Sequence, residues 1–334
     1  MNDPKLWVFF VIVVITNIVY PQNEEPLSLP EYFNAAEHWP HCRQSILSID
    51  NQLDYGICLL TALTHSLADR FCVATNSSIH VSLSIWEAYN CCYKAHTHTL
   101  LPALLCLLLN GTTTGGNVLH ADPGCIPFVP ESCFDRRVYT IPEDLSVSLA
   151  LSCLSNYKLP QSCPRCQETS PKRFYPRHIK DVANPSRMIT SKNTTEIMTE
   201  IMRSGPVVAI MKPCGSVPIN GWIVKDYEYT PKGHVIRIIG WGRDPNGTDY
   251  WLLANSYGIY YGDGGLVKIE RGSNVCDIEN FIIALQPDVD RFFETFNTTS
   301  YRMNLTYIPD KPVFDSATLA EYENYISNAS KNST

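Results

Sequence analysis

Four side chains of this 334-residue chain have the types and the order that thiol chemistry requires. Gln52 and Cys58 lie six residues apart. His234 and Asn255 follow far downstream, His234 at the start of a predicted strand and Asn255 just after the next one. A thiol nucleophile needs a base that takes its proton, a group that orients the base, and a donor that stabilises an oxyanion. The sequence therefore predicts a nucleophilic site built from distant segments.

The surroundings of Cys58 and His234 favour these roles. Apolar residues at positions 59, 60, 63, 67 and 71 predict a helix with Cys58 in its first turn, where free amides and the helix dipole stabilise a thiolate. Gly233 permits close approach beside His234, and Asn255 can hold the imidazole in one tautomer. The alternative for Cys58 alone is a buried free thiol, the commoner role of an isolated cysteine.

The elements that must position these residues form two groups. Residues 82–93 and 100–109 predict further helices, and the Pro- and Cys-rich region 124–180 predicts a loop region pinned by disulfides. After Gly205, short apolar runs separated by turn residues predict strands. Helices first and strands afterwards predict an α+β protein with two subdomains and a site between them.

The composition indicates a folded, exported protein. The chain is 45% hydrophobic and 18% charged, with a net charge of −7, which excludes general disorder and gives no basic surface for nucleic acid. Thirteen cysteines are typical of a disulfide-stabilised secreted protein. The apolar run after Lys5 predicts a signal peptide over residues 1–20, with a signal anchor as the alternative, and no later segment is apolar enough to form a stable membrane span.

Eight N-glycosylation sequons favour the same compartment, a secreted or lysosomal location. They lie at Asn76, Asn110, Asn193, Asn246, Asn297, Asn304, Asn328 and Asn332.

A series of motifs over residues 29–286 resembles the papain family of cysteine peptidases, and within it the cathepsin B type. They include LPEYFNAAEHWPHC from Leu29, GCIPF from Gly124, GHVIRIIGWG from Gly233, YWLLANS from Tyr250 and GDGGLVKIERG from Gly262. The resemblance implies an α+β, papain-like fold with a helical left subdomain, a β-barrel-like right subdomain and a cleft between them.

The resemblance also implies the role of each site residue. Cys58 matches the nucleophile, His234 the base and acid, Asn255 the residue that orients the imidazole, and Gln52 the oxyanion donor. The implied reaction is hydrolysis of peptide bonds through a thioester acyl-enzyme, with peptide or protein substrates, cystatin-like inhibitors as further partners, and no cofactor or metal. Region 124–180 is similar to the occluding loop of cathepsin B.

Four disulfides follow from the resemblance, and four further cysteines stay open as free thiols or additional disulfides. The implied pairs are Cys42–Cys72, Cys91–Cys163, Cys125–Cys166 and Cys133–Cys153, and the open residues are Cys92, Cys106, Cys214 and Cys276.

Several departures from the family pattern lie at the cleft. Tyr55 replaces a structural cysteine, and Leu59, Tyr257 and Tyr261 replace tryptophans that shield the Asn–His bond. Phe134-Asp135-Arg136 stands in place of the histidine pair that binds a C-terminal carboxylate, so dipeptidyl carboxypeptidase activity is expected to be lost or altered, although Arg136 or Arg137 could bind a carboxylate.

Other departures concern specificity and the two ends of the domain. Phe281 stands where the family has a pocket glutamate, which predicts an apolar substrate preference. His96 and His98 are expected to face solvent rather than bind a metal. Residues 21–28 form a short spacer without a propeptide, and residues 287–334 form a glycosylated tail. These changes leave a catalytically inactive binding or matrix protein as the alternative to an endopeptidase.

Overall fold

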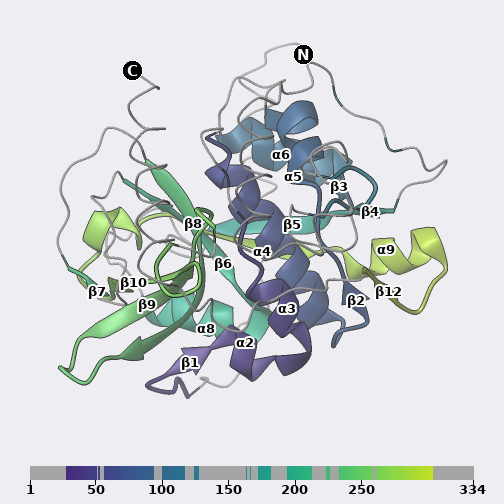
Figure 1. Ribbon diagram of the computed structural model, residues 1–334. Helices are drawn as coiled ribbons and strands as arrows, with labels where there is room; N and C mark the ends of the chain where they lie inside the picture. Colours follow the sequence, from purple (N-terminus) through teal and green to yellow (C-terminus); the bar gives the residue numbers. More distant parts are fainter. Residues whose placement is uncertain are drawn as a thin grey trace, which may run out of the picture.

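Helix α4 (Cys58–Ala74) runs through the middle of the protein, between a large sheet and a smaller helical part (Figure 1). The computed structural model describes residues 28–50, 52, 56–93, 100–116, 124–127, 163, 166, 172–181, 194–212, 223–225, 233–258 and 261–303. All side chains of α4 from Leu59 to Cys72 are buried. The helix carries polar as well as apolar residues, and its buried charges Asp69 and Arg70 are both paired.

The sheet on one side of α4 follows the order β5-β11-β6-β8-β9-β10-β7, and β1 pairs with β8. Among the described residues this path is open, with β5 and β7 at its edges, rather than a closed barrel. Most neighbours are antiparallel, and β10 and β7 are parallel. The strands are β1 (Phe33–Asn34), β5 (Pro176–Asp181), β6 (Val207–Met211), β7 (Ile223–Val224), β8 (His234–Arg243), β9 (Asp249–Ala254), β10 (Leu266–Glu270) and β11 (Ile282–Pro287).

A glycine decides how β1 reaches the sheet. A Cβ atom at Gly240 would lie 2.2 Å from the Phe33 carbonyl oxygen, so only glycine lets β1 lie against β8.

The remaining helical elements before residue 287, within the described residues, are short apart from α6 and α8. They are α2 (Ala35–His38), the 3₁₀ turn Pro40–Cys42, α3 (Arg43–Ile46), α5 (Ile85–Glu87), the π-helical turn Ala88–Tyr93, α6 (Leu100–Asn110), α8 (Thr194–Ser204) and the 3₁₀ turn Val275–Asp277.

The helical part has its own apolar core, separate from the core under the sheet. Leu60, Leu63 and Phe71 of α4 belong to it, whereas Cys72 belongs to the core on the sheet side. Two short ladders complete this part: β3 (Thr112–Thr113) pairs with β4 (Arg173–Phe174), and β2 (Ile79–His80) pairs with β12 (Tyr301–Arg302). Two cores on either side of one helix confirm the prediction of two subdomains.

Residues after the last sheet strand pack against the helical part. Asp288 caps helix α9 (Val289–Phe296), because its side chain accepts a hydrogen bond from the Arg291 amide. Phe292 of this helix is 1% exposed and stacks on Phe174 with ring centroids 4.9 Å apart. The first part of the region after residue 287 is thus an integral part of the fold.

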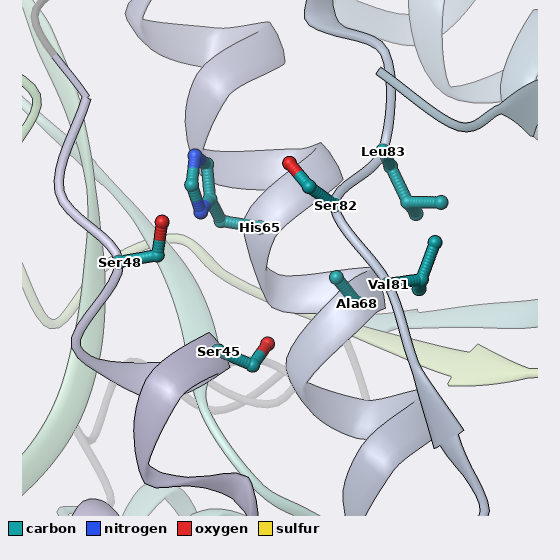
Figure 2. Close-up of a pocket in the computed structure, with 7 residues that line it drawn as sticks. All are labelled: Ser45, Ser48, His65, Ala68, Val81, Ser82 and Leu83. Atoms are coloured by element: carbon teal, nitrogen blue, oxygen red, sulfur yellow. The ribbon is translucent and has the colours of Figure 1, made fainter. Parts of the chain in front are cut away.

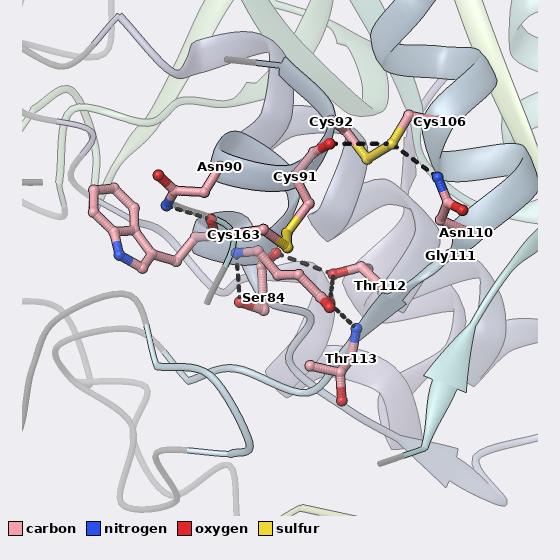
Figure 3. Close-up of a disulfide and its surroundings, with 12 residues drawn as sticks. Ser84, Asn90, Cys91, Cys92, Cys106, Asn110, Gly111, Thr112, Thr113 and Cys163 are labelled. Carbon is pink, nitrogen blue, oxygen red and sulfur yellow. Dashed lines mark hydrogen bonds between the residues drawn. A yellow bond between two sulfur atoms is a disulfide. The ribbon is translucent and has the colours of Figure 1, made fainter. Parts of the chain in front are cut away.

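Disulfides fasten the irregular segments. Cys42–Cys72, Cys91–Cys163 and Cys125–Cys166 are present, as the family resemblance implies, and Cys92–Cys106 is a further bond. Figure 3 shows that the adjacent cysteines 91 and 92 tie the π-helical turn to residue 163 and to α6. Cys276 is also disulfide-bonded. Cys133 and Cys153 lie outside the described residues.

Buried charges connect α4 with the sheet. The Arg237 guanidinium of β8 pairs with the Asp69 carboxylate of α4 and donates to the Ser48 carbonyl oxygen at 2.7 Å. Arg70 of α4 pairs with Glu200 of α8 at 2.9 Å. Because unpaired buried charges are strongly unfavourable, these pairs fix how the two layers sit on each other.

In the part of the chain that the structure describes, no helix is both long and apolar enough to cross a membrane.

Candidate active site

Cys58 is the first residue of α4 and the one free cysteine among the described residues. Its side chain is half-buried, and it accepts a backbone hydrogen bond from Val235, the second residue of β8. The thiol therefore lies where the helical part meets the sheet. Its bonding partner Val235 directly follows His234 in the chain. The predicted helix and its N-terminal cysteine are both confirmed.

Strand register brings His234 and Asn255 together. Arg237 of β8 lies opposite Ala254 of β9, so the residues that follow Ala254 return alongside the start of β8. The imidazole Nε2 lies 2.8 Å from the Asn255 Oδ1 atom. The Ser256 backbone amide also donates to this Oδ1 at 2.8 Å. Since a backbone N–H can only donate, the shared atom is the amide oxygen, and His234 Nε2 must carry a hydrogen.

Two hydrogen bonds to Ser256 hold Gln52 next to His234 and Asn255. The Gln52 backbone N–H donates to the Ser256 carbonyl oxygen at 2.8 Å, and the Ser256 hydroxyl donates to Oε1 of the Gln52 side chain at 2.6 Å. The second bond holds the side-chain carboxamide by its oxygen, so its nitrogen, Nε2, can act as an oxyanion donor. The motifs did not single out Ser256, although its position directly after Asn255 was a usable signal.

The electrostatics of the site favour neutral partners. Burial raises the pKa of the Cys58 thiol above its ordinary value, against backbone hydrogen bonds that lower it. Burial lowers the pKa of His234 below its ordinary value, and the bond to Asn255 raises it. Within the described part of the chain, no hydrogen bond joins Cys58 to His234. Both shifts favour the neutral thiol and the neutral imidazole over an ion pair.

Aromatic rings cover the imidazole. The Tyr257 ring stacks on His234 with centroids 4.8 Å apart, and Tyr261 meets Tyr257 edge to face at 5.2 Å. Leu59, which follows the thiol, is 7% exposed. Tyr257 thus shields one face of the histidine from water.

Two small cavities near the site share His65 and Ser48 in their linings. One is bordered by Thr61, His65 and Asn255 and has a volume of about 10 Å³. The other has the same volume, and Figure 2 shows the Ser45, Ser48 and Ser82 side chains around it. Each is about the size of one water molecule. His65 Nε2 lies 2.5 Å from Asp50 Oδ2, so a buried polar pair forms part of the lining of the first cavity.

The other predicted site residues are only partly placed. Gly233 is exposed at the start of β8, and Phe281 is 41% exposed, with its carbonyl oxygen accepting from the Ile210 amide on the strand beside β8. The sequons at Asn76, Asn110, Asn246 and Asn297 are exposed. The following residues lie outside the described part of the chain: Tyr55, His96, His98, Phe134, Asp135, Arg136, Arg137, Asn193, Cys214, Asn304, Asn328 and Asn332.

Solved structures with this architecture support the fold. A procathepsin B from Trypanosoma congolense superimposes with a TM-score of 0.59 and 20% sequence identity over 81% of this chain and 82% of that chain. At this identity the likeness concerns the fold alone.

Sequence comparisons define the family more closely. The model described as papain family cysteine protease matches residues 29–285. Cathepsin B-like cysteine proteinase 3 of Caenorhabditis elegans is 33% identical over 78% of this chain, and the match spans 66% of that relative, just under two thirds. Cathepsin B-like cysteine proteinase 4 of the same organism is 31% identical over 78% of this chain and 76% of its own length. With this match and the grouping of Cys58, His234, Asn255 and Gln52, the chain belongs to the papain family of cysteine proteases, in its cathepsin B-like branch.

Proposed function

We propose that this protein is a cysteine endopeptidase of the secretory pathway. The observation that carries the proposal is the convergence of four groups around the start of β8: Cys58, His234, Asn255 and Gln52. We assign Cys58 the role of nucleophile, His234 that of base and acid, Asn255 that of orienting the imidazole, and Gln52 that of oxyanion donor. The disulfides and the eight sequons support a secreted or lysosomal location.

In the proposed reaction, Cys58 Sγ attacks the carbonyl carbon of a peptide bond and its proton passes to His234 Nδ1. The Gln52 amide nitrogen binds the oxyanion, the C–N bond breaks, and the Nδ1 proton goes to the leaving amine. Water then hydrolyses the thioester with His234 as base, which regenerates the thiol. Asn255 keeps the imidazole oriented through its 2.8 Å bond to Nε2.

The proposal includes two features of specificity. The partly exposed Phe281 favours apolar side chains in a substrate, and Gly233 leaves room for a substrate main chain. Dipeptidyl carboxypeptidase activity is expected to be lost or altered. Cystatin-like proteins are the inhibitors expected to bind such a cleft.

A non-catalytic binding protein is the second candidate. It is favoured by the directions of the two pKa shifts, raised for Cys58 and lowered for His234, because a thiol is a much weaker nucleophile than a thiolate. For the protein to be a peptidase, a bound substrate would have to rearrange the site so that the Cys58 proton passes to His234 and leaves a thiolate.

The deciding experiment is labelling with an epoxide probe for thiol peptidases, at pH 5 to 7, beside Cys58→Ala and His234→Ala. We expect an adduct on Cys58 of the wild type, none in Cys58→Ala, and labelling at least about a hundredfold slower in His234→Ala. Thermal unfolding of each variant controls for folding. Absence of an adduct on folded wild-type protein would favour the non-catalytic candidate.

A further inference from the structure

The Tyr257 hydroxyl lies next to the one imidazole nitrogen that the proposed reaction needs. Its oxygen is 3.4 Å from His234 Nδ1, a long hydrogen bond that is about 0.2 Å beyond the usual range. The two rings stack with an angle of 22° between their planes. The β8–β9 register explains the contact, because continuing it three residues beyond the Arg237–Ala254 pair places residue 257 opposite residue 234.

Only Nδ1 of His234 can take the Cys58 proton. Nε2 is committed to Asn255, and the argument from the Ser256 amide shows that it carries a hydrogen. In the neutral imidazole, Nδ1 is then an acceptor without a hydrogen, so the hydroxyl donates to it. A hydrogen bond donated to Nδ1 stabilises the neutral ring and opposes its protonation.

The groups around the ring keep the phenol in its donating form. Burial raises the pKa of Tyr257 well above its ordinary value, and the negative charge of a Cys58 thiolate and Tyr261 raise it further. Cys58 comes from α4 and the two tyrosines from the loop after β9, while the neighbouring strand β6 places Met211, which does not titrate, opposite His234. The phenol thus stays protonated at neutral pH.

We propose that the Tyr257 hydroxyl is a positioning group that holds His234 as a neutral imidazole and thereby keeps Cys58 a protonated thiol in the resting protein. This restraint rests on the proposed function for the roles of Cys58 and His234. When the hydroxyl turns away from Nδ1, the Cys58 proton can pass to this nitrogen and leave a thiolate beside an imidazolium. No other reactant is needed. A substrate in the cleft that draws the hydroxyl to itself would release the restraint.

The variant Tyr257→Phe tests the proposal because it keeps the stacked ring and removes only the hydroxyl. The rate of Cys58 alkylation by iodoacetamide is measured from pH 5 to 9, with the modified peptide identified by mass spectrometry. We expect the alkylation profile to shift to lower pH and the rate at pH 6 to rise about fivefold, the effect of one neutral hydrogen bond. Tyr257→Trp, which also lacks the hydroxyl, should change the rate in the same direction.

Two controls separate this effect from a general loosening of the fold. Tyr250→Phe removes a hydroxyl from a buried tyrosine of β9 and should leave the profile unchanged. In a His234→Ala background, Tyr257→Phe should have no effect, since the hydroxyl acts through the imidazole.

An unchanged or slower alkylation of Tyr257→Phe overturns the proposal, as does an equal gain in the His234→Ala background. Alkylation needs no peptide substrate, so its outcome is independent of the proposed activity. Faster alkylation of the variant, together with no epoxide adduct and no peptide hydrolysis by the wild type, would leave the restraint standing and reject the peptidase.

Discussion

Ser256 joins the two halves of the proposed catalytic site. Its amide donates to Asn255, the residue proposed to orient the base, and its hydroxyl and carbonyl hold Gln52, the proposed oxyanion donor. One residue thus sets both the imidazole and the oxyanion donor. Geometry that is fixed before the reaction is worth most in the transition state, where the charge develops.

Ser256→Ala should lower kcat about fivefold and leave KM nearly unchanged, because Gln52 loses one hydrogen bond that matters mainly when the oxyanion forms. Steady-state hydrolysis of a fluorogenic peptide measures this split. Ser273→Ala, an exposed serine in the turn after β10, is the matched control. A raised KM with unchanged kcat would instead place Ser256 in substrate binding.

Residue types and chain order selected Cys58, His234, Asn255 and Gln52, because few side chains can perform the predicted chemistry; the structure brings these residues together, and their roles stay a prediction. The contacts of Ser256 and Tyr257 could not be predicted in the same way. They depend on which residues face each other across β8 and β9, and a register shift between Ile238 and Gly240 alters that pairing within the strand.

At the scale of elements, the segment after the sheet closes the helical subdomain. Phe292 of α9 packs on Phe71 and Phe174, and β12 adds a parallel strand beside β2. Lys172 lies over the Tyr301 ring at 4.9 Å, which further attaches the segment. Without it, this apolar surface would be open to water.

Phe292→Ala should reduce the free energy of unfolding by about 3 to 5 kcal/mol, as expected for removing a fully buried ring. Urea denaturation followed by tryptophan fluorescence gives the value. Leu109→Ala, at a side chain that is 70% exposed, should change the free energy by less than about 0.5 kcal/mol. Equal effects of the two substitutions would show that α9 adds little to the core.

The sequence predicted some elements much better than others. Helix α4, helix α6 and strands β6, β8, β9 and β10 have clear periodicity or apolar runs and were predicted. Strand β5 mixes proline with charged residues, so its pairing with β11 is a tertiary effect. Helix α9 does carry apolar residues at 289, 292, 293 and 296, the spacing of one helix face, but it lies in a region dominated by sequons.

At the scale of the whole molecule, buried polar groups hold the subdomains in one arrangement. The Arg237–Asp69 pair joins β8 to α4, and the His65–Asp50 pair joins α4 to the segment that carries Gln52. The candidate site residues come from both sides of this contact. The fold therefore sets the distance between Cys58 and His234 through buried ion pairs outside the candidate site.

Stability should fall in acid because two histidines are held neutral. Burial lowers the pKa of His80, helped by the nearby charge of Arg302, and burial also lowers the pKa of His234. Below about pH 6.5 the unfolded chain binds protons that the folded protein does not, so stability is complete above this pH and declines below it.

This decline is measured as the difference in free energy of unfolding between pH 7.5 and pH 5.5. His80→Gln should show a smaller difference than the wild type, and His38→Gln, at an exposed histidine of α2, should show the same difference. If His80→Gln loses as much stability as the wild type, His80 does not contribute to the acid sensitivity.

The β2–β12 ladder also decides when the helical subdomain can be completed during synthesis. The Ser82 amide is bonded to the Met303 sulfur, across 221 positions of the chain. Until the ribosome has released Tyr301 and Arg302, β2 has no partner strand and the core around Phe71 is uncovered. The half of the protein that is translated first is therefore finished last, and a chain that stalls before α9 would present this open core to chaperones.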